Sequence, residues 1–205
     1  MHQVFVNIVA EDRLSEAVIR RLLHESPLQL SVGRVFSGHG RGYISSRING
    51  FIRAAQYVPF VIVMDSDVDA CAQRVLLRLN LIERPPNCII RIAVHEVESW
   101  LLADTKGIAS FLGIPSRLIP AQTDHILHPK EFIIEKVRKY GKRSLRTEIV
   151  PADGSTATQG PMYNDILSQF VLKRWNIHDA CNKSESLLRA VRNIKRFRPE
   201  CNPEA

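Results

Sequence analysis

The stretch VIVMDSDVDACAQ, from Val61 to Gln73, runs from apolar residues directly into three aspartates, Asp65, Asp67 and Asp69. A short apolar run of this kind is typical of a buried strand. Aspartates at the end of such a strand can be turn residues, with Asp69 as the N-cap of the following helix. They can equally be ligands of a metal ion. Whether these aspartates are structural or bind a metal depends on which other residues the fold places beside them.

Strand-like and helix-like patterns alternate through the first half of the chain. The strand-like segments are Val4–Ala10, Leu28–Phe36, Phe60–Met64 and Cys88–Val94. Helical periodicity separates them, and this alternation predicts an α/β fold with a parallel sheet of about four strands flanked by helices. The second half is punctuated by prolines and predicts helices at Pro129–Tyr140, Tyr163–Val171 and Lys183–Phe197. We therefore expect an α/β core over residues 1–112 and a helical C-terminal elaboration over 113–205, packed on the core as one structural unit.

Composition narrows the class of protein. The 205 residues are 45% hydrophobic and 24% charged, as in ordinary globular proteins, and the net charge is +7. No apolar run reaches the roughly 18 residues that span a bilayer, so we expect no membrane partner. The N-terminus lacks a signal-peptide pattern and the four cysteines form no C-x-x-C pair, so we expect reduced thiols in the cytoplasm. The positive charge permits a polyanionic partner.

Acidic residues follow three of the predicted strands. Glu11 ends the first, Asp65 and Asp67 end the third, and Glu96 and Glu98 follow the fourth. Functional groups of a parallel sheet gather beyond the carboxyl ends of its strands, so these acids are expected to meet at one edge. Like charges held together repel unless a cation compensates them, and Mg²⁺ or Mn²⁺ prefers such oxygen ligands. The pattern favours a metal site for phosphodiester cleavage.

Each element of this pattern also has a structural explanation. Glu11 and Asp12 can be first-turn acids that the helix dipole favours, and Glu98 can be a surface residue of the helix that carries Trp100. His39 and His95 are minor candidates only. Trp100 and Trp175 are interpreted as core residues. A P-loop ATPase is excluded by the lack of G-x-x-x-x-G-K-[ST], and the D-x-D pattern departs from haloacid-dehalogenase-type phosphatases at Asp69.

The segments VNIVAE (Val6–Glu11) and VIVMDSD (Val61–Asp67) resemble the Toprim catalytic domain of topoisomerases, primases and overcoming-lysogenization-defect nucleases. The stretch VHEVESWLLAD (Val94–Asp104), with GHGRGYI before it and GPMYNDILSQF after it, resembles a family of small bacterial Toprim-like proteins. The resemblance implies that Glu11 is a metal ligand or general acid/base and that Asp65 and Asp67 position magnesium.

The same resemblance says less about the remaining residues. Glu96 and Glu98 match no residue of the Toprim motif, although the small family has acids at both places, and Glu96 is the preferred extra ligand. A lysine near the metals is implied, with Lys142 as its candidate. The chain has neither a topoisomerase cleavage domain nor the zinc module of a primase, so a nuclease remains.

A basic segment follows in the second half of the chain, EKVRKYGKRSLRTE from Glu135 to Glu148. Its cationic residues are Lys136, Arg138, Lys139, Lys142, Arg143 and Arg146. They predict contacts with nucleic-acid phosphates, while an ordinary solvated face is an equal alternative. The C-terminal helix, with Arg189, Arg192 and Arg196, is more simply a solvated amphipathic helix.

Together these observations predict a Mg²⁺- or Mn²⁺-dependent nuclease in which Glu11, Asp65, Asp67 and Glu96 are catalytic and Glu98 completes the metal shell. The substrate is nucleic acid, either DNA or RNA. By analogy alone, the protein acts in bacterial defence or mobile-element conflict, with an ATPase or another defence-system subunit as a partner. Two alternatives stay open: a non-catalytic nucleic-acid-binding accessory subunit, and a phosphohydrolase that acts on small substrates.

Overall fold

The computed structural model describes residues 3–38, 40–66, 71–81 and 84–200. Four strands form one all-parallel sheet: β1 (Val4–Val9), β2 (Leu30–Phe36), β3 (Phe60–Asp65) and β4 (Cys88–Ala93). Their order in space is β2-β1-β3-β4. This confirms the predicted fold class, an α/β protein with a four-stranded parallel sheet flanked by helices. The arrangement is consistent with a Toprim-like fold.

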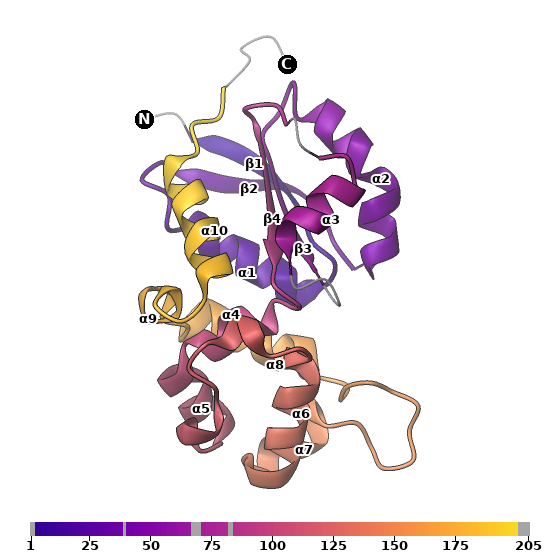
Figure 1. The fold of residues 1–205 in the computed structure, drawn as a ribbon, viewed down its shortest axis with the longest axis vertical. Coiled ribbons are helices and arrows are strands. Elements are labelled where there is room, and N and C mark those ends of the chain that lie inside the picture. Colours follow the sequence, from indigo (N-terminus) through magenta and orange to yellow (C-terminus); the bar gives the residue numbers. More distant parts are fainter. Residues whose placement is uncertain (1–2, 39, 67–70, 82–83, 201–205) are drawn as a thin grey trace.

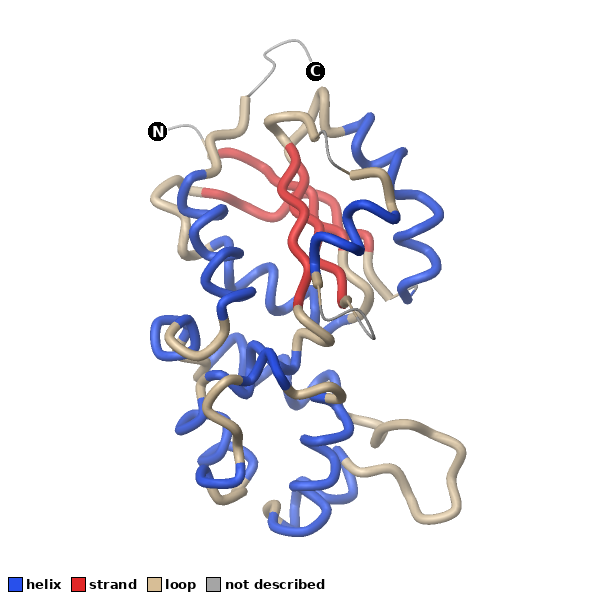
Figure 2. The backbone as a smooth tube through the Cα atoms, viewed as in Figure 1, coloured by secondary structure: helices blue, strands red, loops and turns tan. Residues whose placement is uncertain are grey.

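Helices cover both faces of the sheet and then continue beyond its carboxyl ends (Figures 1 and 2). The helices are α1 (Arg13–Leu23), α2 (Gly40–Ala54), α3 (Ala72–Arg78), α4 (Glu98–Ala103), α5 (Thr105–Leu112), α6 (Pro129–Tyr140), α7 (Arg143–Ile149), α8 (Tyr163–Lys173), α9 (Ile177–Cys181) and α10 (Glu185–Arg196), with short 3₁₀ turns at Ser116–Leu118 and Thr123–His125. Within the described part of the chain, no helix has the length and apolar character needed to cross a bilayer.

The apolar run of β3 is explained by burial on both sides. Phe60, Ile62 and Met64 belong to the cluster under α2 and α3, whereas Val61 and Val63 belong to the cluster under α1 and α10. In a strand that is covered on both faces, every side chain is buried, so the sequence is continuously hydrophobic and does not alternate with polar residues. Only at Asp65, where the strand ends, does the pattern become polar.

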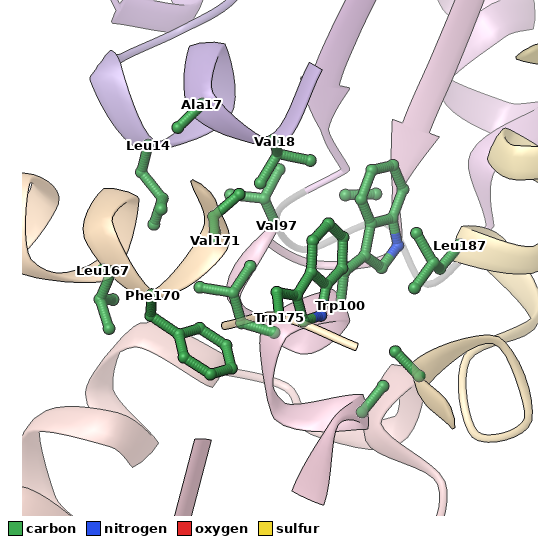
Figure 3. Packing of buried hydrophobic residues seen from close by; sticks show 14 of the residues in the cluster. Leu14, Ala17, Val18, Val97, Trp100, Leu167, Phe170, Val171, Trp175 and Leu187 are labelled. Atoms are coloured by element: carbon green, nitrogen blue, oxygen red, sulfur yellow. The ribbon is translucent and has the colours of Figure 1, made fainter. Parts of the chain in front are cut away.

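The helical C-terminal part lies against the carboxyl ends of the strands, and α10 returns to cover the sheet beside α1 (Figure 1). One hydrophobic cluster runs from β1 to Phe197 at the end of α10. Figure 3 shows its centre, where Leu14 and Val18 of α1 face Phe170 and Val171 of α8. Burial on this scale fixes the helices to the sheet.

The predicted core positions of the two tryptophans are confirmed. Trp100 is fully buried and Trp175 is 3% exposed. The Trp100 indole donates a hydrogen bond to Ser186 Oγ at 2.6 Å, which links α4 to the first turn of α10. The helix that carries Trp100, α4, ends at Asp104, which is also the N-cap of the next helix, α5.

Asp104 joins three elements through its buried carboxylate. Its Oδ1 accepts a hydrogen bond from the Gly107 backbone at 3.0 Å, and its Oδ2 accepts one from the Asn176 backbone at 2.9 Å. These bonds cap α5 and fix the turn that begins α9. Removing the carboxylate would leave two backbone donors without their acceptor.

We expect Asp104→Ala to lower the free energy of unfolding by about 1–3 kcal/mol, because a helix cap and a second hydrogen bond are lost together. Urea denaturation would measure the change. Asp153→Ala is the matched control, since its ion pair with Arg138 is on the surface and its side chain is 95% exposed. Equal midpoints for the two variants would contradict this role of Asp104.

Candidate active site at the carboxyl edge of the sheet

The topology selects one place at the sheet edge. The chain passes from β1 to β2 on one side and then crosses to β3 on the other side of β1. The connections from β1 and β3 therefore diverge, which leaves a crevice at the carboxyl ends of these two strands, where α/β proteins bind their ligands. Glu11 follows β1, and Asp65 is the last residue of β3.

The structure brings these two residues into contact. The backbone N–H of Asp65 donates to Glu11 Oε1 at 3.1 Å. Burial raises the pKa of Asp65 well above its usual value, and the negative charges of Glu98, Glu11, Asp12 and Glu96 raise it further. Acids that follow the two neighbouring strands, β1 and β4, thus act on the carboxyl group at the end of β3. Asp67, Asp69 and His39 lie outside the described residues.

Asp12 has the structural role considered above. Its Oδ1 accepts a hydrogen bond from the Ser15 backbone at 2.8 Å, and it is the N-cap of α1. Its charge still acts on Asp65.

The Asp65 carboxylate also shapes the turn between β4 and α4. Its Oδ1 accepts a hydrogen bond from the Val97 backbone at 3.0 Å, and Ser66 Oγ accepts one from the His95 backbone at 2.7 Å. His95 itself has φ +62°, a left-handed conformation that is uncommon for a residue with a side chain. The end of β3 therefore holds this turn in place, and the turn carries Glu96 and Glu98.

Glu96 and Glu98 are both engaged by the helical C-terminal part. Glu96 Oε2 accepts a hydrogen bond from the backbone N–H of Lys130 at 2.7 Å, in the first turn of α6. Glu98 is only 2% exposed, and its Oε1 accepts a hydrogen bond from the Tyr163 hydroxyl at 3.1 Å. The ammonium group of Lys130 lies 3.8 Å from the same oxygen.

Burial and the neighbouring charges together shift the pKa values of Glu98, Lys130 and Tyr163. Burial raises the pKa of Glu98 to about 7, which the charge of Lys130 opposes and those of Glu96 and Asp12 support. Burial alone would lower the pKa of Lys130, but the surrounding acids outweigh it and raise the pKa. Burial and the charge of Glu98 raise the pKa of Tyr163, so its hydroxyl stays protonated and donates. Lys130 is the cation that compensates the acidic edge.

Lys130 is a site residue that the sequence interpretation missed. A lysine in the first turn of a helix opposes the helix dipole, which normally favours acids there, and this anomaly was the available signal. The candidate Lys142 is elsewhere: its Nζ donates to the carbonyl oxygens of Ser110 and Phe111, at 2.9 and 2.8 Å, near the C-terminal end of α5. Tyr163, predicted only as the first residue of a helix, lies against Glu98.

The predicted nucleic-acid contacts are divided between α6 and α7, at the end of the molecule remote from the sheet (Figure 1). Several have partners within the chain. Arg138 pairs with Asp153 at 2.9 Å and Lys136 with Glu135 at 2.8 Å, and Arg146 donates to the Gly141 carbonyl. Lys139 and Arg143 are exposed. Because α6 rises about 1.5 Å per residue, Lys139 is roughly 14 Å along the helix from Lys130.

The acids offer the hard oxygen ligands that Mg²⁺ and Mn²⁺ prefer, and their mutual repulsion is what a cation would relieve. Among the described residues, however, no three acidic, histidine or cysteine side chains are placed to share one ion. Glu11 and Asp65 thus supply part of a metal site. Asp67, two residues after Asp65 in the sequence, is the third candidate ligand.

No family model, curated protein or solved structure matches this chain. The functional argument therefore depends on the residues themselves and on their arrangement.

The raised pKa of Glu98 makes stability depend on pH. In the unfolded chain this group loses its proton near pH 4.5, whereas in the folded protein it keeps the proton up to about pH 7. The folded state binds more protons in this window, so the free energy of unfolding falls as the pH rises. Glu98→Gln cannot titrate, and we expect it to gain roughly 2–3 kcal/mol relative to wild type between pH 5 and pH 8.

Urea denaturation in EDTA at several pH values would measure this gain, with the exposed Glu131→Gln as the control. Parallel pH profiles for wild type and Glu98→Gln would show that Glu98 ionises normally.

Proposed function

We propose that this protein is a metal-dependent nuclease whose active site is the carboxyl edge of β1 and β3. The observation that carries the proposal is the contact of Asp65 with Glu11 at the topological switch point, where the charges of four other acids raise the pKa of Asp65. The resemblance of both segments to the Toprim domain supports the same conclusion. Its setting would be bacterial cytoplasm, in defence or mobile-element conflict.

Glu11, Asp65 and Asp67 would hold Mg²⁺ or Mn²⁺. Such an ion, when bound, supplies Lewis-acid stabilisation of the phosphoryl oxygens and acidifies water. Glu96 and Glu98 would then position Lys130 and would not be direct metal ligands. Glu96 binds the backbone N–H of Lys130, and Glu98 pairs with the Lys130 ammonium group.

The chain's own groups would perform the remaining tasks. Glu11 would take or give a proton at the reacting oxygen, since it is the acid that directly follows β1. Lys130 would hold a phosphate oxygen of the substrate beside the acids, because its ammonium group lies 3.8 Å from Glu98 Oε1 and 6.0 Å from the centre of the Tyr163 ring. Lys139 and Arg143 would contact phosphates farther along the strand.

A non-catalytic accessory subunit is the second candidate. It is favoured by the finding that the described residues do not place three ligands on one ion. In that case a partner protein, such as an ATPase or another defence-system subunit, would complete the site or supply the activity.

The central test is cleavage of a panel of DNA and RNA substrates with Mg²⁺, Mn²⁺ or EDTA. We expect metal-dependent cleavage by wild type and by the surface control Glu135→Gln. Glu11→Gln, Asp65→Asn and Asp67→Asn should each lose about 10²–10⁴-fold in rate.

Cleavage that survives in all three variants would place the active site elsewhere. Binding of nucleic acid without cleavage under any condition would favour the accessory subunit, and hydrolysis of nucleotides alone would favour a small-substrate phosphohydrolase.

Lys130 and Lys142 provide a matched pair of substitutions. We expect Lys130→Ala to lower the cleavage rate by about 10–100-fold, because a positioned charge beside the acids is lost. Lys142→Ala should leave the rate nearly unchanged, since its ammonium group is bound by backbone carbonyls. Calorimetric titration with Mn²⁺ would check that Lys130→Ala still binds the metal. The opposite order of effects would identify Lys142 as the lysine of the site.

A further inference from the structure

A second polar cavity lies at the open edge of β4, outside the acidic site. Its volume is about 290 Å³, and it is lined by the start of α3, by β4 and by the first turn of α10. Figure 1 views the sheet from this edge, with α10 on one side of β4 and α3 on the other. Arg91 of β4 and Arg189 of α10 both contribute to its wall.

Arg91 is the unusual member of this wall. Its Nε is buried and has no hydrogen-bond partner among the described residues. A guanidinium that loses water without gaining an anion is costly to the folded state. Burial lowers the pKa of Arg91, and the positive charges of Arg84 and Arg189 lower it further, so three cationic groups act on one another here.

The acids of the cavity do not neutralise Arg91. Asp124 accepts hydrogen bonds from Ser184 Oγ at 2.7 Å and from the backbone and hydroxyl of Ser186 at 2.9 and 3.2 Å. Glu185 is paired with Arg189 at 2.8 Å on the surface of α10. Arg84 is held over the edge strand by its hydrogen bond to the Ile90 carbonyl at 3.2 Å. Among the described residues, Arg91 is therefore left without an acidic partner in this cavity.

We propose that Arg91, with Arg189 on the same cavity wall, binds a phosphate group in this cavity. The planar fork of a guanidinium matches the oxygens of a phosphate, which it can bind with two parallel hydrogen bonds. The place is close to the acidic edge: Arg91 is two residues before Ala93, which pairs with Asp65, so its backbone lies about 7 Å from that edge, toward the amino end of β4. The phosphate is either free, as in a small nucleotide, or the 5′-terminal group of a strand.

The experiment compares wild type with Arg91→Met and with Arg192→Met, an exposed arginine of α10 outside the cavity. Thermal unfolding is followed in EDTA with inorganic phosphate, and with sodium chloride at the same ionic strength. Phosphate should raise the melting temperature of wild type and Arg192→Met by at least about 2 °C and leave Arg91→Met unchanged. Without phosphate, Arg91→Met should be at least as stable as wild type, because a half-buried guanidinium with an unpaired Nε is replaced by an apolar side chain.

Equal stabilisation of wild type and Arg91→Met by phosphate, or no stabilisation of either, would overturn the proposal. Arg189→Met, a change on the surface of α10, is the second variant if Arg91→Met fails to fold, and it should weaken the phosphate effect. Fluorescence anisotropy with 5′-phosphorylated and 5′-hydroxyl oligonucleotides separates the two sources. A preference of about tenfold for the phosphorylated strand, lost in Arg91→Met, identifies a strand end.

Equal binding of the two strands by a protein that phosphate stabilises identifies a free phosphate. These measurements need no metal and leave Glu11 and Asp65 intact, so their outcome is independent of the cleavage test.

Discussion

The parallel pairing of β3 with β1 and β4 is the constraint on which the remaining structure depends. It aligns Val9 with Ile62 and Asp65 with Ala93, so the chain leaves three neighbouring strands at the same edge of the sheet. Every polar group that follows a strand is then delivered to one narrow region. An edge built in this way concentrates negative charge, and the protein has to compensate it.

The helical C-terminal part supplies much of that compensation. The first turn of α6 brings the backbone N–H of Lys130 to Glu96 and its ammonium group to Glu98, while Tyr163 at the start of α8 completes the shell of Glu98. A buried carboxylate without these partners would be strongly unfavourable. The same contacts also attach the helices to the sheet, next to the apolar cluster of α1, α4 and α8 (Figure 3). Fold and site are therefore stabilised together, since the helices that bury the edge also compensate part of its negative charge.

The sequence predicted the parts of this arrangement that depend on local patterns. The apolar run before Asp65 identified β3, and the proline before Lys130 identified the start of α6, because burial on two faces and a preset φ leave clear local signals. The partners of Glu98 left no such signal. Lys130 and Tyr163 are 32 and 65 residues away from it in sequence, and only the packing of α6 and α8 beyond the strand ends brings them close. The sequence patterns also could not show that the Lys142 ammonium group donates hydrogen bonds to backbone carbonyls near the end of α5 and does not lie at the acidic edge.

The two charged regions of the sheet edge differ in how their charge is balanced, and this difference separates their chemistry. Around Asp65 the acids outnumber the one lysine among the described residues that the structure places beside them, which leaves a demand for a cation. Around Arg91 the two nearby acids are bound to serines and to Arg189, so the buried Nε of Arg91 has no acidic partner among the described residues and can accept an anion. A phosphate group is such an anion, and hydrolysis of a phosphate ester is assisted by a bound cation. A chain that keeps an acidic edge beside a half-buried arginine with an unpaired Nε is thus suited to hold one phosphate while a neighbouring one reacts.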